Sequence, residues 1–286
     1  MNGTIQEVLE LLDLEQIEVN IFRGISPKDR WQRVFGGQVL GQALVAASRT
    51  VEQRVCHSLH AYFIRPGDPR VPILYEVDRS RDGKSFTTRR VVAIQHGQQI
   101  FNLAASFHVP EPGLEHQFDM PRVAGPETLE PEDARRRRLA HQLPEAVREH
   151  FMKPGPMDVR PLEEDEDLIN PKKGPPYHDV WLKAKGSMPD DLALHQCVLA
   201  YASDMTLLDT CLIPHGVSWY SGRLQSASLD HAMWFHHPFR VDDWILYSHD
   251  SPCAGGARGF NRGMMFTREG KLVASVAQEG LIRLRS

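Results

Sequence analysis

Residues 63–78 read FIRPGDPRVPILYEVD, and residues 235–250 read FHHPFRVDDWILYSHD. The two stretches share six identical residues at one offset of 172 positions (235 minus 63), including the run Ile-Leu-Tyr. The same offset continues without a gap and pairs Gly83 with Gly255, Arg90 with Arg262 and Ala105 with Ala277. This period is too long for a solenoid, so the sequence predicts two copies of one small domain in tandem.

The residues around the first stretch predict a sheet wrapped around a helix. Small and apolar residues recur at helical spacing over residues 36–47, which begin Gly36-Gly37. The turn signals Asp82-Gly83 and His96-Gly97 separate runs rich in β-branched and aromatic residues. We expect strands at 58–64, 73–79, 85–95 and 99–109. One apolar helix followed by an antiparallel meander indicates an α+β domain.

The second copy repeats this order. We expect a strand at 180–185, an apolar helical run at 192–213, and strands at 224–235, 243–250, 259–267 and 271–284. Prolines and charge runs between the copies indicate a connecting segment that contains a helix at 139–152. The predicted organisation is an N-terminal domain over 1–112, a partly ordered linker over 113–176 and a C-terminal domain over 177–286.

Composition limits the possible partners. The chain has 286 residues and a formal net charge of -4, which gives no basic field for nucleic acid or an anionic membrane. No stretch approaches the ~20 apolar residues of a membrane span. Residues 1–20 are acidic with a helical pattern, unlike a signal peptide, and the final Leu-Arg-Ser is not the peroxisomal Ser-Lys-Leu. We therefore expect a cytoplasmic location.

Asp204 is the first residue that the core pattern does not explain. In the apolar run it shares a helical face with Ala200, Leu207 and Leu208, where a lone carboxylate is costly unless it is paired. The first copy has Arg49 at the matching position, so the fold does not require the acid. A nearby helix end would oppose ionisation further. Because such carboxylates concentrate in active sites, Asp204 is a candidate catalytic residue; an ordinary helix cap is the alternative.

Ser228 and Gln278 are two further polar residues placed in strands of the second copy that are otherwise apolar or aromatic. Their counterparts in the first copy are Cys56 and Ser106. Taken separately, each is explained as a hydrogen-bonded core residue. Together with Asp204 they form a set that could hold one water molecule: the carboxylate takes its proton, while the hydroxyl and the amide orient it.

Other chemistries receive weaker support. His57 and His60 are three residues apart on a strand and face opposite sides, so we expect no metal site. The four cysteines show no Cys-x-x-Cys spacing, and no Gly-x-Ser-x-Gly elbow occurs. The segment Gly255–Gly263 joins glycines to Arg258 and Arg262, which could bind phosphate groups; a glycine-rich bend with surface arginines is an equal alternative.

Several long motifs resemble those of the acyl-CoA thioesterase II (TesB-type) family. They are Val34–Val39, His57–Asp68, Arg81–Phe86, Tyr201–Asp204, Asp230–His236, Ala257–Phe260 and Gln278–Gly280. The resemblance covers nearly the whole chain except the segment around 135–167. It implies a double hotdog fold, in which two helices are each wrapped by an antiparallel sheet. It also implies hydrolysis of fatty acyl-CoA to fatty acid and CoA without a cofactor.

The same resemblance implies site residues and partners. The family's water-activating acid, hydroxyl and amide fall on Asp204, Ser228 and Gln278; many members carry Thr at the second position. A homo-oligomer is expected, since double hotdogs commonly pair again. For an acyl-CoA substrate, the loops with Arg258 or Arg262, identified above from the sequence itself, are candidate contacts to the CoA phosphates. Two alternatives stay open: a hydratase of enoyl-CoA, which would use an Asp–His pair, and a non-catalytic acyl-CoA sensor. Asp230 and His231 are adjacent on a strand and point to opposite faces, which disfavours the hydratase.

Overall fold

A computed structural model describes residues 3–27, 33–163 and 167–285. The N-terminal part contains two helices and six strands, in the order α1 (Ile5–Leu12), β1 (Glu15–Glu18), β2 (Ile21–Gly24), α2 (Gly36–Ser48), β3 (Val55–Phe63), β4 (Ile73–Asp82), β5 (Phe86–Gln95) and β6 (Gln98–His108). The sequence prediction of a helical pattern over 1–20 is correct for α1 and wrong beyond Leu12, because β1 and β2 form a hairpin there. Residues 1–2 lie outside the described residues.

The remaining elements continue from the connecting segment into the second copy. They are η1 (Pro126–Thr128), α3 (Glu132–Leu139), η2 (Ala140–Gln142), α4 (Glu145–Met152), β7 (Met157–Pro161), β8 (Tyr177–Ala184), α5 (Leu192–Ser203), η3 (Leu207–His215), η4 (Trp219–Ser221), β9 (Leu224–Ser228), β10 (Asp230–Phe235), β11 (Ile245–Gly255), β12 (Arg258–Thr267) and β13 (Leu272–Leu284).

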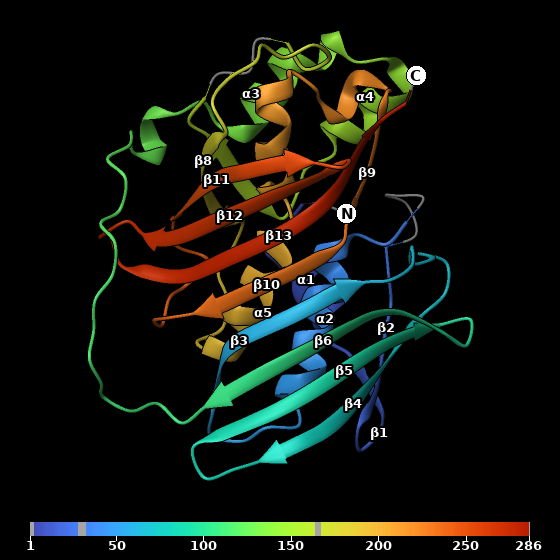
Figure 1. The fold of residues 1–286 in the computed structure, drawn as a ribbon, viewed down its shortest axis with the longest axis vertical. Helices are drawn as coiled ribbons and strands as arrows, with labels where there is room; N and C mark the ends of the chain where they lie inside the picture. The colour runs from blue at the N-terminus through green and yellow to red at the C-terminus, as the bar shows by residue number, and fades with distance from the viewer. Residues whose placement is uncertain (1–2, 28–32, 164–166, 286) are drawn as a thin grey trace.

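The strands of both copies form one antiparallel sheet. Its order is β1-β2-β4-β5-β6-β3-β10-β13-β12-β11-β8-β7, and β9 pairs with the far end of β13. The two copies meet at β3 and β10, where Ala232 lies opposite His60. The predicted offset recurs in the structure, since β5 and β12 begin at residues 86 and 258 and end at residues 95 and 267. Figure 1 shows the sheet in front of α1, α2 and α5.

These observations confirm the predicted α+β double hotdog, in which the two central helices pack against each other. The N-terminal half of α2 contacts the C-terminal half of α5, so the helices run antiparallel. The contact is close because glycines form it: a Cβ at Gly37 would lie 2.2 Å from the carbonyl oxygen of Tyr201, and one at Gly41 would lie 3.1 Å from that of Cys197. Larger residues would push the helices apart.

The segment 109–176 follows the border of the sheet and then covers one end of the second copy. After β6 it runs upward beside the red strands to α3 and α4 in Figure 1. On the way, the Gln117 side chain donates a hydrogen bond to the carbonyl oxygen of Gly270. The helix predicted at 139–152 is correct only for α4, which begins at Glu145, because α3 ends at Leu139 and a short 3₁₀ helix, η2, lies between them. The domain boundaries at 112 and 177 stay a prediction, although β7 pairs with β8 across the second of them.

Two element boundaries in the second copy differ from the sequence prediction. The apolar run 192–213 is not one helix: α5 ends at Ser203, Asp204 is its C-cap, and a 3₁₀ helix, η3, begins at Leu207. The strand predicted at 224–235 breaks at Leu229, whose N–H donates to the carbonyl oxygen of Glu279. Asp204 and Ser228 therefore both lie where a regular element stops, which frees their side chains for each other.

We expect Gly37→Ala to lower the free energy of unfolding by about 1–3 kcal/mol, because the new Cβ meets a backbone carbonyl oxygen that cannot rotate away. Gly41→Ala is the matched control in the same helix. Its Cβ has more room, and the helix propensity gained, about 1 kcal/mol, offsets the contact. Urea unfolding of both variants checks this. Equal stability losses at the two positions would contradict the helix contact described here.

Candidate active site

The side chain of Asp204 lies between the two copies. It is 5% exposed and follows the last turn of α5, whose C-terminal end carries partial negative charge. Facing it is the start of α2, where Gly37 donates a backbone hydrogen bond to the carboxylate. A Cβ at Gly36 would lie 2.5 Å from Asp204 Oδ2, so only glycine admits the carboxylate at this position. One copy thus supplies the acid and the other supplies its cradle.

Ser228 and Gln278 both reach this carboxylate. Gln278 on β13 is fully buried, and its Nε2 donates to Asp204 Oδ1 over 2.5 Å. Ser228, the last residue of β9, donates from Oγ to the same oxygen over 3.3 Å. The three candidates from the sequence therefore lie within hydrogen-bonding distance in the structure. Their catalytic role stays a prediction.

The surroundings of Asp204 make it a stronger base than an ordinary aspartate. Burial raises its pKa from 3.8 to about 6, while the hydrogen bonds from Gln278, Ser228 and Gly37 oppose the rise. A carboxylate with a pKa near neutrality is ionised at cellular pH and still accepts a proton readily. Asp204 therefore has the protonation behaviour that a general base needs.

The structure also brings in His231, which the sequence analysis weighed only beside Asp230. His231 is fully buried, and its Nδ1 lies 4.0 Å from Asp204 Oδ1. The expectation that Asp230 and His231 face opposite sides is correct, since Asp230 Oδ1 instead accepts the backbone N–H of Glu279. The acid–imidazole pair in the structure is therefore Asp204 with His231. Their closeness depends on where α5 ends, and residue spacing in the sequence does not indicate it.

A large cavity opens beside Asp204 and Ser228, with a volume of about 1880 Å³. Apolar residues of η3 line one part of it, among them Leu208, Leu212 and Ile213. Cationic residues also line it, namely Arg33, Arg135, Arg136, Lys172, Lys173 and Arg285, and so do the acidic residues Glu132, Glu163, Asp167 and Asp209. Most of these cations come from the segment 113–176, to which the sequence analysis assigned no function. The cavity thus combines apolar side chains of η3, which we call the apolar wall, with these cations, which we call the basic wall, around the opening at Asp204.

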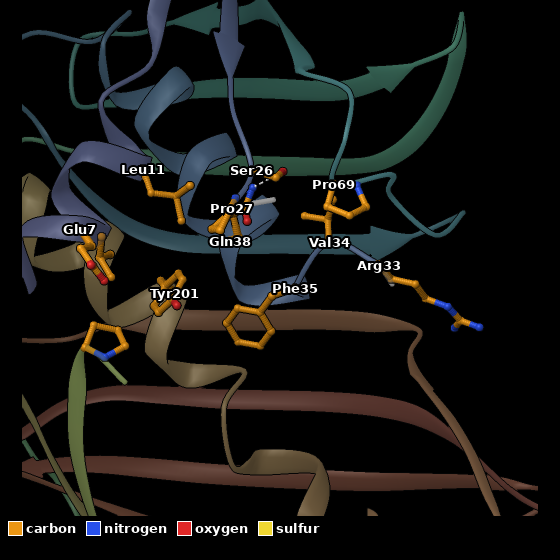
Figure 2. Close-up of a pocket in the computed structure, with 12 residues that line it drawn as sticks. Glu7, Leu11, Ser26, Pro27, Arg33, Val34, Phe35, Gln38, Pro69 and Tyr201 are labelled. Carbon is orange, nitrogen blue, oxygen red and sulfur yellow. Dashed lines mark hydrogen bonds between the residues drawn. The ribbon is translucent and has the colours of Figure 1, made fainter. Parts of the chain in front are cut away.

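A second, smaller pocket of about 60 Å³ borders the same region (Figure 2). It lies among Leu11 of α1, Gln38 of α2 and Tyr201 of α5, and shares Phe35 with the large cavity. The rings of Phe35 and Tyr201 meet edge to face with centroids 5.2 Å apart. This aromatic pair stands next to Gly36 and Gly37 and so fixes the start of α2 beside the site.

Arg258 and Arg262 do not line either pocket. Arg258 forms an ion pair with Glu279 over 3.0 Å, and Arg262 forms one with Asp250 over 2.8 Å. Both guanidinium groups are about half exposed, so they lie at the surface of β12. Their assignment to phosphate groups stays a prediction.

Among the described residues, no group of three or more His, Cys, Asp or Glu side chains is placed to hold a metal ion. One described helical run, Leu192–His215, is long and apolar enough to cross a membrane by length and composition, and 61% of its apolar window is buried inside the protein. This run contains α5 and η3, which form the core around Asp204.

Comparison with known proteins gives consistent matches over nearly the whole chain. Residues 156–281 match the family described as acyl-CoA thioesterase, and residues 27–108 match the acyl-CoA thioesterase N-terminal domain. Acyl-CoA thioesterase 2 of Haemophilus influenzae is 41% identical over 99% of this chain and 99% of its own length. Acyl-coenzyme A thioesterase 8 of Homo sapiens is 41% identical over 99% of this chain and 91% of its own.

A solved structure agrees with these sequence relatives. The acyl-CoA thioesterase II TesB2 from Mycobacterium marinum has a TM-score of 0.79 and 45% sequence identity, covering 98% of this chain and 99% of its own. Similarity at this level extends over both copies and over the segment between them.

The raised pKa of Asp204 predicts a stability difference that depends on pH. The Asp204 carboxyl group keeps its proton up to about pH 6 in the folded state and only up to about pH 4 in the unfolded state. The contribution of this group to the free energy of unfolding is therefore fully present below pH 4 and is lost as the pH rises through 6. We expect Asp204→Asn to be more stable than the native protein by about 1–3 kcal/mol near pH 7.5, with no such gain near pH 4. Denaturant unfolding at both pH values checks this; a gain of equal size at both would contradict it.

Proposed function

Because this chain belongs to the acyl-CoA thioesterase family, we propose that it hydrolyses fatty acyl-CoA by attack of a water molecule held at Asp204, Ser228 and Gln278. The chain is an acyl-CoA thioester hydrolase; the proposal concerns the residues and the mechanism. The observation that supports it is the convergence of a carboxylate of raised pKa with a hydroxyl and an amide, where the carboxylate and the hydroxyl line one cavity and the amide is buried behind them.

The proposed reaction proceeds without a covalent enzyme intermediate. Asp204 takes a proton from the water molecule while the oxygen of that water attacks the thioester carbonyl carbon. Ser228 and Gln278 hold the water and the carboxylate in line. The negative charge on the carbonyl oxygen is stabilised by the positive end of α2, which begins at Gly36 beside the carboxylate. The intermediate then expels CoA as a thiolate, and the proton on Asp204 passes to the sulfur.

The large cavity suits both parts of the substrate. Its apolar wall at Leu208, Leu212 and Ile213 is suited to an acyl chain, and its basic wall is suited to phosphate groups. Its volume of about 1880 Å³ exceeds that of ordinary small-molecule sites, as a ligand of the size of acyl-CoA requires. We therefore place the nucleotide end of CoA near Lys172 and Lys173.

The hydratase alternative has less support. It would need an Asp–His pair that reaches the substrate, and the pair that the structure offers is Asp204 with His231. The imidazole is fully buried behind the carboxylate, so it cannot donate a proton to a bound thioester directly. A non-catalytic acyl-CoA sensor would bind the substrate but release no CoA thiol, so a turnover assay distinguishes it from the enzyme.

The location and the oligomeric state expected from the sequence remain proposals. We propose a cytoplasmic homo-oligomer. Support for self-association comes from apolar side chains that the strands leave exposed, namely Tyr62 on β3, Leu74 on β4 and Phe86 on β5, which are 61%, 41% and 47% exposed.

Removal of the proposed base or of the amide should abolish turnover without abolishing binding. We expect Asp204→Asn and Gln278→Ala to lower kcat about 10²–10⁴-fold while acyl-CoA still binds, and Ser228→Thr to keep most activity because it retains the hydroxyl. Release of CoA thiol from acyl-CoA esters of increasing chain length, together with calorimetric binding, measures both. An acyl group found on Ser228 by mass spectrometry would overturn the water mechanism.

The two possible phosphate contacts can be separated by their effects on KM. If the basic wall binds CoA, the double variant Lys172→Ala/Lys173→Ala should raise KM about tenfold with little change in kcat, since uniform binding is lost. Arg258→Ala/Arg262→Ala removes the same amount of charge from β12 and should leave KM nearly unchanged. The reverse pattern would support the arginines, and no effect in either would show that neither pair contacts CoA.

A further inference from the structure

His231 on β10 occupies an unusual place for a polar side chain. It is fully buried, and its Nε2 lies 2.9 Å from Ser203 Oγ. Its Nδ1 is also buried, and among the described residues it has no hydrogen-bond partner. The nearest charged atom to this nitrogen is Asp204 Oδ1, 4.0 Å away. Because an unpaired buried polar atom costs about 1–3 kcal/mol, the position needs an explanation.

The neighbours of His231 fix which ring nitrogen carries the hydrogen. Ser203 Oγ also lies 2.9 Å from the carbonyl oxygen of Ala200, which can only accept. The serine hydroxyl therefore donates to Ala200, and His231 Nε2 must be the donor to Ser203. Burial lowers the pKa of His231 to about 3, so the ring is neutral at physiological pH. Nδ1 then presents a bare lone pair toward Asp204.

A lone pair that faces an ionised carboxylate is a pairing of two acceptors. The arrangement becomes favourable when a hydrogen lies between them, and Asp204 gains one when it takes the proton of the attacking water. The distance of 4.0 Å suits one bridging water, or a direct bond after a small rotation of the carboxyl group. The Nδ1 lone pair of His231 can therefore accept a hydrogen bond from Asp204 only after Asp204 has taken a proton from the water.

We propose that His231 is a positioning residue for hydrolysis, which accepts the hydrogen of protonated Asp204 at Nδ1 and so stabilises the state formed as water attacks. The inference rests on Asp204 acting as the base. No atom is gained or lost in this step: one O–H bond of water breaks, the proton stays on Asp204, and it leaves with the CoA sulfur. Ser203 acts by holding the tautomer that leaves Nδ1 bare.

Few other groups can influence the titration of Asp204. Gly36 and Gly37 of α2, Ser228 of β9 and Gln278 of β13 carry no charge. Among the described residues, Tyr247 of β11 is a titratable group that interacts with the carboxylate, and its burial raises its pKa well above 10, so it stays neutral across the working range. A shift in the acidic limb of the pH profile of kcat/KM therefore reports on the pKa of Asp204 and on its neighbour His231.

The test is the pH dependence of kcat/KM in variants that change only the group beside Asp204. His231→Gln keeps an amide that can reach Ser203 and removes the acceptor, so protonated Asp204 loses its partner. We expect its acidic limb to move about one pH unit lower and its kcat at neutral pH to fall about tenfold. His231→Asn places an amide where Nδ1 stands, which can donate to the ionised carboxylate, and should move the limb at least as far.

His195→Gln is the matched control. His195 is also a buried histidine, on the same helix as Asp204 but at its other end, where its Nδ1 accepts the N–H of Val241. The His195→Gln variant should have a lower free energy of unfolding but the same acidic limb of kcat/KM as the native enzyme. If both His231 variants kept the acidic limb of kcat/KM at the pH of the native enzyme, the inference would be overturned. If Asp204→Asn kept full turnover, the proposed function would fail instead, so the two failures are distinguishable.

A measurement on the native enzyme covers the case in which the His231 variants do not fold. Nitrogen-15 NMR of histidine-labelled protein reads the tautomer of each ring. We expect His231 to carry its hydrogen on Nε2 throughout, with an Nδ1 signal that shifts as Asp204 titrates near pH 6. A hydrogen on Nδ1 at neutral pH, or an Nδ1 signal that ignores this titration, would overturn the inference.

Discussion

The close contact between α2 and α5 is the constraint on which the site depends. Glycines at positions 36, 37 and 41 let two antiparallel helices approach to a distance that any side chain at Gly37 would prevent. The approach places the positive end of one helix against the negative end of the other, with the Asp204 carboxylate between them. Burial at this junction and the opposing hydrogen bonds together give a carboxyl group that is poised near neutral pH rather than fully acidic.

The two copies differ in the residue that caps the C-terminal end of their central helix. At the C-terminal end of α2, Arg49 is the C-cap, and its guanidinium reaches Asp13 and the carbonyl oxygen of Leu14. A cation at a helix C-terminus is stabilising, whereas a carboxylate there is costly. The counterparts of the other site residues are also engaged: the Cys56 carbonyl oxygen accepts the Gln196 amide, and Ser106 bonds His57. The first copy therefore uses these three positions for structural contacts, and the second copy supplies the three candidate site residues.

Much of this arrangement was readable from the sequence, for a physical reason. Strands that share a gapless offset must occupy equivalent places, so a residue that differs from its counterpart stands out, as Ser228 and Gln278 do beside Cys56 and Ser106. Asp204 stood out because it is a lone carboxylate in an apolar helical run and matches Arg49 of the first copy. What the sequence did not reveal depends on long-range packing. The end of α5 at Ser203 lies within an unbroken apolar run, and the break at Leu229 follows from pairing with β13. Neither the closeness of His231 to Asp204 nor the cavity wall built by residues 132–173 has a local signal.

The seam between β3 and β10 has a consequence for how the molecule acquires activity. Asp230 lies opposite Tyr62 there, so the contact closes a loop of well over half the chain. Contacts between such distant residues form slowly, because the entropy of loop closure must be overcome first. Gly36 and Gly37 precede Gln278 by about 240 residues, so these parts of the site are synthesised far apart in time. A chain still emerging from the ribosome therefore holds no assembled site until residue 278 has been added and the two halves have closed along β3 and β10.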